Sequence, residues 1–327
     1  MSYKAWSVDE AGRRFREIEL GQRPLEVNQV LVRIAAAGLN PLDTKIRAGK
    51  ADHAKQPLPA VLGLDMAGIV EETGSSVTTF KSGDEVYGLV GGVGGLQGTL
   101  AERIVVDADL LAHKPNELSM RQAAALPLSI ITAWEGLVDR AKVHENQTVL
   151  IHAGAGGIGH VAIQIARAYG ANVFATVSND KKRIVEDFGA IPIDYQSTSV
   201  EEYVSAYTAG KGFDIVYDTV GGATLDASFA SVKRYTGHVL SALGWGSHSL
   251  APLSFRGATY SGVFTLLPLL TGENRAHHGR ILAQAAVLSH EGKLLPLLGE
   301  KRFSMEDLDA AFGLVESGPF GKIVIEL

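Results

Sequence analysis

The sequence predicts an α/β protein in which a partly open β-barrel is followed by a doubly wound parallel sheet. Three observations carry this prediction. Irregularly spaced β-type runs extend to about residue 118, and strand and helix patterns alternate from about residue 120. A glycine-rich loop, residues 152–159, follows an apolar strand and precedes an amphipathic helix. The 327 residues are enough for two domains of ordinary size.

The first part of the chain contains short β-type runs separated by turns. These runs cover residues 29–36, 66–71, 85–90 and 102–106, with Gly and Pro at the breaks. Their irregular spacing favours a partly open barrel over a repeat array. Residues 91–98 read GGVGGLQG and predict a loop.

The second part alternates between the two structural periods. Residues 121–137 are helical in pattern, with a break at Pro127. Six strands are then expected, at residues 148–153, 172–177, 191–194, 214–219, 238–243 and 260–264. Helices are expected at residues 159–169, 181–188 and 200–207. This alternation indicates parallel pairing with right-handed crossovers, hence a doubly wound sheet.

The C-terminal segment after about residue 265 is expected to return to the first domain. It has helical patterns at residues 279–289 and 305–316, and it ends in a strand pattern at residues 322–327.

Composition excludes several classes of function. The chain has no cysteine, so disulfides, thiolate metal sites and cysteine nucleophiles are excluded. The formal net charge of -6 provides no global field for nucleic acid or an anionic membrane. The N-terminus lacks the pattern of a secretory signal, and the most apolar stretch, around residues 263–270, is too short to span a bilayer. These features favour a cytoplasmic enzyme.

The glycine-rich loop predicts dinucleotide binding. Gly154, Gly156 and Gly159 fit the GxGxxG pattern in the required strand–loop–helix context. Gly154 is expected to allow a tight turn, Gly156 to leave room for a pyrophosphate, and Gly159 to let the helix approach the sheet. The other loop residues expected beside the cofactor are Ala155, Gly157 and Ile158. A flexible loop without a ligand would explain neither the strand nor the helix.

The residues after the next predicted strand favour NADPH over NADH. NAD enzymes usually carry Asp or Glu at this position, whereas residues 177–179 here read VSN. The basic cluster of residues 181–183 (KKR) follows, and it suits a 2′-phosphate. Asp180 is the one acidic residue nearby, and we expect it to cap the following helix. A solvated basic helix start is the alternative reading.

Motifs distributed over nearly the whole chain occur in the order found in one enzyme superfamily. They are residues 38–43 (GLNPLD) with Arg47, 62–70 (LGLDMAGIV), 81–86 (KSGDEV), 123–129 (AAALPLS) with 132–134 (TAW), the glycine loop, 213–222 (FDIVYDTVGG) and 321–325 (GKIVI). On these motifs the chain resembles the zinc-free quinone oxidoreductase branch of the medium-chain dehydrogenase/reductase superfamily. The resemblance implies a GroES-like catalytic domain at residues 1–122, a Rossmann cofactor-binding domain at 123–264, and a C-terminal return at 265–327.

The same resemblance predicts that the protein works without zinc. Zinc alcohol dehydrogenases of this superfamily carry a Cys at the position of Asn40, His-Glu at the positions of Leu64 and Asp65, and a second Cys near Ser129. The residues present here do not complete a tetrahedral set of zinc ligands. Reversible alcohol oxidation is therefore not expected, because it relies on zinc as a Lewis acid.

The resemblance also implies which residues form the site. Asn40 is expected to donate its amide N–H to a carbonyl or a ribose, Asp43 to fix that loop, and Thr132 to lie on the nicotinamide side. Turn chemistry ahead of Pro41 is the alternative for Asn40 and Asp43. The remaining cofactor residues are Ser178, Lys182 and Tyr195 near the 2′-phosphate, and Val220, Leu243 and Phe264 around the nicotinamide.

We therefore expect an NADPH-dependent, zinc-independent oxidoreductase that transfers a hydride to a small-molecule quinone. It is expected to form a homodimer through the last strand of the Rossmann sheet, residues 260–264. Two alternatives stay open: an NADPH-dependent enone or enal double-bond reductase, and a cofactor-binding module with little turnover. For either acceptor the proton can come from water, so no dedicated acid is required.

Overall fold

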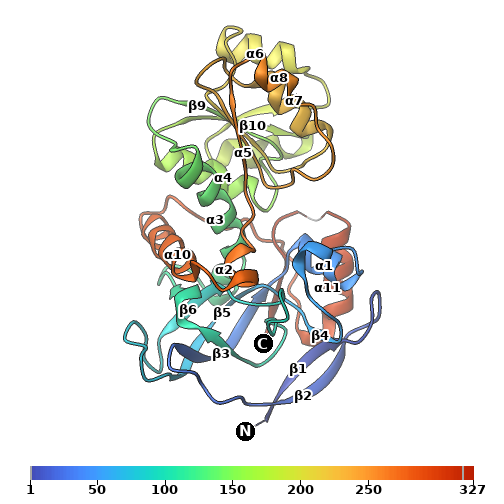
Figure 1. The fold of residues 1–327 in the computed structure, drawn as a ribbon, viewed down its shortest axis with the longest axis vertical. Coiled ribbons are helices and arrows are strands. Elements are labelled where there is room, and N and C mark those ends of the chain that lie inside the picture. Colours follow the sequence, from blue (N-terminus) through green and yellow to red (C-terminus); the bar gives the residue numbers. More distant parts are fainter. Residues whose placement is uncertain (1, 319) are drawn as a thin grey trace. The chain divides into compact units, whose positions relative to one another are not determined.

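The computed structural model describes residues 2–318 and 320–327, and the chain divides into two compact units. The first unit contains Met1–Leu128, Leu266–Gly292 and Pro296–Leu327. The second contains Ser129–Thr265 and Lys293–Leu295. Figure 1 colours the chain by sequence: the blue to blue-green part, the segment Leu266–Gly292 and the red C-terminal part belong to the first unit, and the green to light-orange part between them belongs to the second.

The first unit is built on two antiparallel sheets. The larger has the order β15-β3-β5-β6-β8, with β7 also paired to β3, and the smaller has the order β2-β1-β4. The described strands form no closed barrel, in agreement with the partly open arrangement expected. Their bounds are β1 Ser2–Val8, β2 Arg16–Gly21, β3 Gln29–Gly38, β4 Ala60–Val61, β5 Asp65–Thr73, β6 Glu85–Leu89, β7 Arg103–Asp107, β8 Leu111–His113 and β15 Val324–Glu326.

Strand β3 is the centre of the larger sheet. It pairs with β5 on one side and with β7 and β15 on the other. Its side chains are mostly buried, which explains why its sequence is apolar almost throughout. Gly38, at its end, pairs with both Asp65 of β5 and Val324 of β15. The final strand therefore does return to the first unit, as expected, and it brings residues from the two ends of the chain together.

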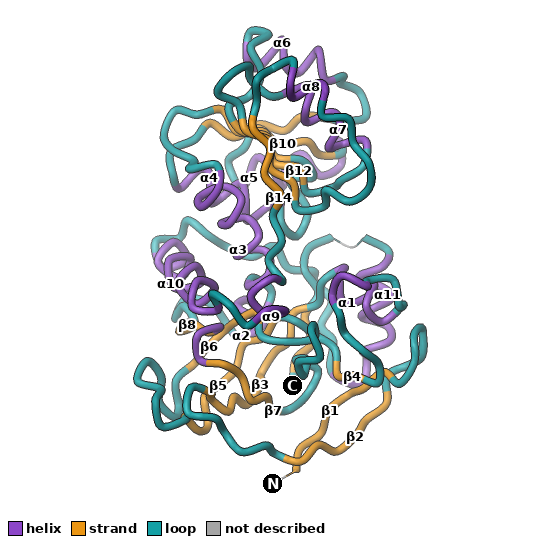
Figure 2. Tube along the Cα trace, viewed as in Figure 1, coloured by secondary structure: helices purple, strands orange, loops and turns teal. Residues whose placement is uncertain are grey.

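Helices pack on these sheets. They are α1 Pro41–Arg47, α2 Met120–Ala124, α9 Leu267–Thr271, α10 Arg275–His290 and α11 Leu308–Glu316. Figure 2 shows α1 and α11 side by side, where Arg47 and Asp309 form an ion pair. The Tyr87 hydroxyl on β6 donates to the Leu282 carbonyl on α10 over 2.7 Å. Helix α1 was not foreseen from the sequence, because it is a single short element within a polar stretch.

The second unit is a six-stranded parallel sheet of order β11-β10-β9-β12-β13-β14. All six strands expected for the second domain are present, within three residues of the expected bounds. They are β9 Thr148–Ile151, β10 Asn172–Val177, β11 Ile191–Asp194, β12 Ile215–Asp218, β13 His238–Ser241 and β14 Thr259–Gly262. Since the chain leaves β9 first toward β10 and later returns to its other side at β12, the order reverses there, as a doubly wound sheet requires.

Helices flank this sheet. They are α3 Pro127–Trp134, α4 Gly159–Ala168, α5 Lys182–Asp187, α6 Val200–Thr208, α7 Ala223–Ser231 and α8 Ala251–Ser254. Helix α3 begins at Pro127, the break seen in the sequence, and a π-helical turn, Glu135–Arg140, continues it. Figure 1 shows α6, α7 and α8 grouped together, away from α4. Helices α7 and α8 were not foreseen.

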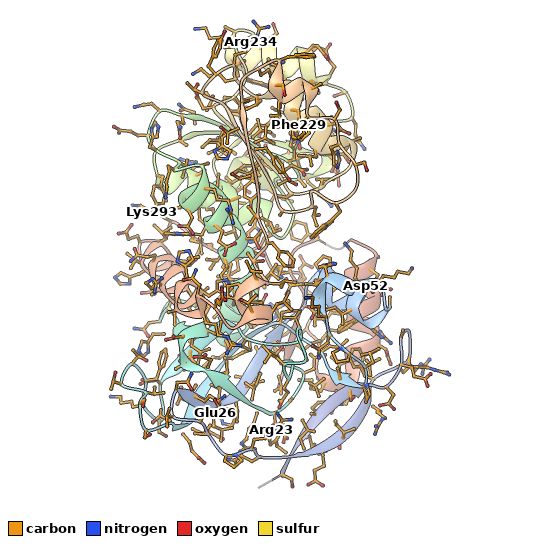
Figure 3. The ribbon with its side chains drawn as sticks, in the orientation of Figure 1. Arg23, Glu26, Asp52, Phe229, Arg234 and Lys293 are labelled. Carbon is orange, nitrogen blue, oxygen red and sulfur yellow. The ribbon has the colours of Figure 1, made fainter. Side chains whose placement is uncertain are left out.

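The core of the second unit is apolar and aromatic. Phe229 of α7, labelled in Figure 3, is 1% exposed and packs with Phe174, Phe213 and Tyr203. Among the described residues, no helix is both long and apolar enough to cross a membrane.

Candidate active site

The glycine-rich loop follows β9 and turns at Ala153 rather than at a glycine. Ala153 has a φ of 54°, in the left-handed region. Its N–H donates to the Thr176 hydroxyl over 3.1 Å, and the N–H of Gly154 donates to the Thr176 carbonyl over 2.9 Å. The loop is therefore tied to β10 at the point where it bends.

The three glycines of the motif have different surroundings. A Cβ at Gly154 would lie 2.6 Å from the Cβ of Ala175 on β10, and one at Gly159 would lie 2.1 Å from the Ala153 carbonyl oxygen. A Cβ at Gly156 would meet only Ala153, at 3.0 Å or more. Gly154 thus provides the close approach to the sheet that we expected of Gly159, while Gly156 borders open space. This space is what a pyrophosphate would need.

Helix α4 begins at Gly159 and supplies the second feature that suits phosphate. Its N-cap, Ile158, makes no side-chain cap hydrogen bond. The N-terminus of a helix presents backbone N–H groups and a partial positive charge to a phosphate, although here the His160 N–H donates to the Gly156 carbonyl over 3.2 Å. Ala155, Gly156 and Ile158 are partly exposed and Gly157 is exposed, so the loop backbone is accessible. The loop therefore fits a dinucleotide.

His152 supports the loop from inside. Its Nδ1 lies 3.1 Å from the Thr176 hydroxyl, within hydrogen-bonding distance. Burial lowers its pKa to about 4, so the ring is neutral at physiological pH. His152 therefore contributes packing and shape rather than charge.

The other expected cofactor residues follow the carboxyl ends of neighbouring strands. Ser178 follows β10, Tyr195 follows β11, Val220 follows β12, Leu243 follows β13 and Phe264 follows β14. Because the strands are parallel, these positions lie along the same edge of the sheet as the glycine loop. Tyr195 and Val220 are 58% and 48% exposed, so both are available to a ligand.

The basic cluster has acidic neighbours. Lys182 begins α5, and its Nζ lies 3.8 Å from a carboxylate oxygen of Asp194, at the end of β11. Asp180 does not cap a helix, contrary to our expectation: its carboxylate hydrogen-bonds to the Ser178 side chain, which lowers the pKa of Asp180. The reason is local, since the chain first makes a 3₁₀ turn, Asn179–Lys181, whose N-cap is Ser178.

Asp218 is a residue at this edge that the sequence reasoning missed. Its buried carboxylate accepts hydrogen bonds from the backbone of Val220 and Gly221 over 3.1 and 2.9 Å and from the Ser241 hydroxyl over 2.7 Å. It thereby shapes the loop that carries Val220. Its position at the end of the apolar run DIVYD was a usable signal, because a carboxylate there needs buried donors.

The first unit contains a buried cluster of four polar side chains: Asn40, Asp43, Asp65 and Lys322. The Asn40 Nδ2 donates to Asp65 Oδ2 over 2.9 Å, and the Lys322 Nζ donates to Asn40 Oδ1. Lys322 Nζ also lies 4.0 Å from Asp65 Oδ2. Each of the four side chains belongs to a residue that is at most 6% exposed.

Asp43 is attached to this cluster through the backbone. Its Oδ2 accepts from the N–H of Asn40 over 2.8 Å, at the start of α1. Asp43 therefore fixes the Asn40 loop, and the turn chemistry considered as an alternative is also present. The structure places Asn40 and Asp43 together.

Burial dominates the electrostatics of the cluster. It raises the pKa of Asp43 to about 7 and the pKa of Asp65 to about 6, although the Lys322 ammonium opposes both shifts. Burial also lowers the pKa of Lys322, opposed by the two carboxylates. One ammonium thus faces two carboxyl groups that cannot both ionise without cost.

The chemistry of these side chains does not fit zinc. The cluster offers an amide, two carboxyl groups and an ammonium, and the ammonium already occupies the amide oxygen. Among the described residues, no group of three or more His, Cys, Asp or Glu side chains could hold a metal ion. Lys322 was missed from the sequence, although it lies in the GKIVI motif.

Thr132 belongs to the second unit and is buried. Its hydroxyl lies 3.4 Å from that of Thr265, and its carbonyl accepts from the Tyr217 hydroxyl over 2.6 Å. Helix α3 is thereby held against β12, next to the loop of Val220.

The second unit carries a glycine-rich loop that fits a dinucleotide on a parallel sheet, and the first unit carries a buried polar cluster on antiparallel sheets. Together these features are typical of a two-domain oxidoreductase. Residues 26–116 match the family model of the alcohol dehydrogenase GroES-like domain, and residues 157–272 match that of zinc-binding dehydrogenase. The protein belongs to the medium-chain dehydrogenase/reductase superfamily and is an NAD(P)H-dependent oxidoreductase.

Three similar proteins illustrate the range of this superfamily. The crystal structure of an alcohol dehydrogenase superfamily protein from Novosphingobium aromaticivorans is 55% identical, with a TM-score of 0.97 over 99% of both chains. The NADPH-dependent alkenal/one oxidoreductase of Arabidopsis thaliana is 35% identical over 92% of this chain and 72% of its own length. The quinone oxidoreductase from Coxiella burnetii is 29% identical, with a TM-score of 0.84 over all of both chains.

Proposed function

We propose that the protein is an NADPH-dependent, zinc-independent reductase whose acceptor is a quinone. The observation that carries this proposal is the Asn40–Asp65–Lys322 cluster. It offers a hydrogen-bond donor and a cation but no ligand set for a metal that would activate an alcohol. A carbonyl acceptor that is already electrophilic, such as a quinone, suits this equipment.

The residues of the second unit would hold the cofactor. NADPH, when bound, supplies a hydride from its nicotinamide ring. The backbone of residues 154–159 would bind the pyrophosphate, with Gly156 providing the space. Val220, Leu243 and Phe264 would surround the nicotinamide, and Thr132 would lie on the same side. Asn40 would donate to the acceptor oxygen, where negative charge develops.

The preference for NADPH rests on the cations that follow β10. Residues 181–183 are all basic, and no carboxylate stands directly at the end of the strand. Ser178, Lys182 and Tyr195 would bind the 2′-phosphate. Lys182 would then exchange Asp194 for the phosphate, a partner of higher charge.

An NADPH-dependent enone or enal reductase is the second candidate. It is favoured by the 35% identity to the Arabidopsis alkenal/one oxidoreductase. Both acceptors are conjugated carbonyl compounds that need a donor at the oxygen, and Asn40 would serve either.

We also propose a homodimer formed through β14. This strand is the edge of the parallel sheet, and Tyr260 on it is 38% exposed. An unpaired edge strand readily pairs with another strand. Sedimentation velocity should give the mass of a dimer, and a monomer at micromolar concentration would contradict the proposal.

The decisive experiment follows the oxidation of NADPH and of NADH with 1,4-naphthoquinone, an alkyl enal or 2-cyclohexen-1-one as acceptor. A parallel assay follows the reduction of NADP⁺ by simple alcohols, and the products of both assays are identified. We expect quinone reduction with NADPH, unchanged after treatment with a chelator. Faster turnover of the enal or enone would select the second candidate. Alcohol oxidation that requires zinc would refute both, and binding of NADPH without turnover would indicate a cofactor-binding module.

A further inference from the structure

The amide of Asn40 is held in one orientation by two neighbours of opposite charge. Its Oδ1 accepts from the ammonium of Lys322, and its Nδ2 donates to the carboxylate of Asp65 over 2.9 Å. Rotating the amide by half a turn would place its oxygen against a carboxylate and its NH₂ against an ammonium. Both hydrogen bonds would then be lost, so the assignment of nitrogen and oxygen is determined by the charges.

In this orientation one of the two N–H groups of the Asn40 amide has no acceptor among its neighbours in the described part of the chain. An amide NH₂ has two N–H groups, and Asp65 accepts only one of them. Within residues 2–318 and 320–327, the interactions of Asn40 include no second acceptor for Nδ2. Asn40 is 1% exposed, and a buried donor without an acceptor is costly. The remaining N–H is therefore available to an acceptor atom of a ligand.

The three side chains stand on one rigid platform. Gly38 of β3 pairs with Asp65 on one side and with Val324 on the other, and the N–H of Leu39 donates to the Ile323 carbonyl over 2.9 Å. Asp65 also accepts from the N–H of Leu128 over 2.9 Å. Asp65 begins β5, Asn40 follows β3 and Lys322 precedes β15, so the three side chains lie at the paired ends of adjacent strands and cannot shift independently.

We propose that Lys322 and Asp65 are positioning residues that present Asn40 to the acceptor as a hydrogen-bond donor only. This inference rests on the proposed function and adds the feature that determines acceptor specificity, namely the fixed orientation of the Asn40 amide. The ammonium polarises the amide from its oxygen side, which strengthens the outward N–H. The ligand that matches is a carbonyl compound whose oxygen gains negative charge, whereas a hydroxyl that must donate finds no partner.

A double-mutant cycle tests whether Lys322 acts through Asn40. We expect Asn40→Ala to lower kcat for 1,4-naphthoquinone about 100-fold, as for loss of one oxyanion donor, and Lys322→Met to lower it at least about tenfold. In the Asn40→Ala background, Lys322→Met should cost little more, because the amide that it positions is gone. The dissociation constant of NADPH should stay within about twofold in every variant, since its residues lie in the second unit.

Two further variants separate positioning from folding. Lys114→Met is the matched control: Lys114 is also a buried lysine of the first unit, bonded to the carbonyls of Pro115 and Leu118 but remote from the cluster. It should lower the melting temperature and leave kcat nearly unchanged. Lys322→Arg keeps the charge and should recover most of kcat. Lys322→Gln, which lacks the charge, replaces Lys322→Met in the cycle if that variant does not fold. Losses that multiply in the double variant would overturn the proposal.

Infrared spectroscopy gives a readout that does not need turnover. The probe is 2-cyclohexen-1-one added to the protein saturated with NADP⁺. We expect a carbonyl stretch at lower wavenumber than in water in the native protein and Lys114→Met, and loss of that shift in Asn40→Ala and Lys322→Met. A native protein without the shift would overturn the positioning role. A shift without turnover of any acceptor would refute the proposed function and leave the positioning role standing.

Discussion

The glycine loop of the second unit and the polar cluster of the first are built in opposite ways. The loop comprises eight consecutive residues, 152–159, between one strand and one helix. The cluster is assembled from residues 40, 43, 65 and 322, which are far apart in the sequence. The loop depends on the shape of its backbone and lacks side chains where a ligand would approach. The cluster depends on buried side chains that hydrogen-bond to one another in place of water.

This difference predicts where each region is vulnerable. Adding atoms should damage the loop, because a Cβ at Gly154 or Gly159 would lie 2.6 or 2.1 Å from a neighbouring atom and one at Gly156 would enter the space that a pyrophosphate needs. Removing atoms should damage the cluster, because its charged groups are buried and depend on one another instead of on solvent. Substitutions in each region, with a matched control, can therefore break or sharpen the comparison.

The largest effect is expected for Asp65→Ala. It leaves Lys322, the Asn40 amide and the Leu128 N–H without their carboxylate. Breaking a buried charged network typically costs about 3–5 kcal/mol of the free energy of unfolding. Asp187→Ala is the control, because its ion pair with Arg183 is exposed and should matter little. Chemical denaturation of both variants measures the difference, and similar values for the two would contradict the buried-network description.

A pH-dependent effect is expected for Asp43→Asn. Burial raises the pKa of Asp43 from 3.8 to about 7, so its ionisation destabilises the folded protein. The stability it contributes is fully present below about pH 4 and is lost as the pH rises through 7. Relative to the native protein, Asp43→Asn should gain about 4 kcal/mol between pH 4 and pH 8. Thermal unfolding across this pH range measures the gain. A difference in stability that does not depend on pH would show that the pKa of Asp43 is not raised.

In the loop, Gly159→Ala and Gly156→Ala form a matched pair. The new Cβ at 159 would lie 2.1 Å from the Ala153 carbonyl, so we expect a loss of about 2 kcal/mol in stability. At 156 the nearest atom is 3.0 Å away, so the protein should fold normally but bind NADPH at least about tenfold more weakly. Fluorescence titration and thermal unfolding separate the two outcomes. Normal NADPH affinity in Gly156→Ala would remove its role at the pyrophosphate.

The smallest effect concerns cofactor choice. Lys182→Ala should raise the KM for NADPH about tenfold, the size of one charge-assisted contact, and leave the KM for NADH unchanged. Lys211→Ala is the control, because Lys211 is exposed and precedes β12, at the opposite edge of the sheet. Equal changes of KM for both cofactors in Lys182→Ala would count against a phosphate role for Lys182. The acidic neighbours Asp180 and Asp194 would then explain why this basic cluster does not select NADPH.

The sequence by itself determined the second unit closely. Its four central strands are apolar runs that are mostly buried, and helical patterns separate the strands, so order and pairing follow from local pattern and crossover handedness. The glycine motif lies inside this pattern and was placed correctly. Even here, packing assigned the individual roles: the turn lies at Ala153, and Gly154 rather than Gly159 meets the sheet. Asp180 was misjudged because a 3₁₀ turn precedes the helix.

Only the tertiary structure decided what surrounds Asn40. Sequence pattern identified Asn40 and Asp43 as candidates but contained no sign that Lys322 would join them, because the pairing of β15 with β3 connects residues about 280 positions apart. Local patterns report neighbours along the chain, whereas burial, the orientation of an amide and the pKa of a carboxyl group depend on neighbours in space. The fold therefore brings the positive charge of Lys322 to Asn40, where the sequence lacks the metal ligands of the zinc enzymes.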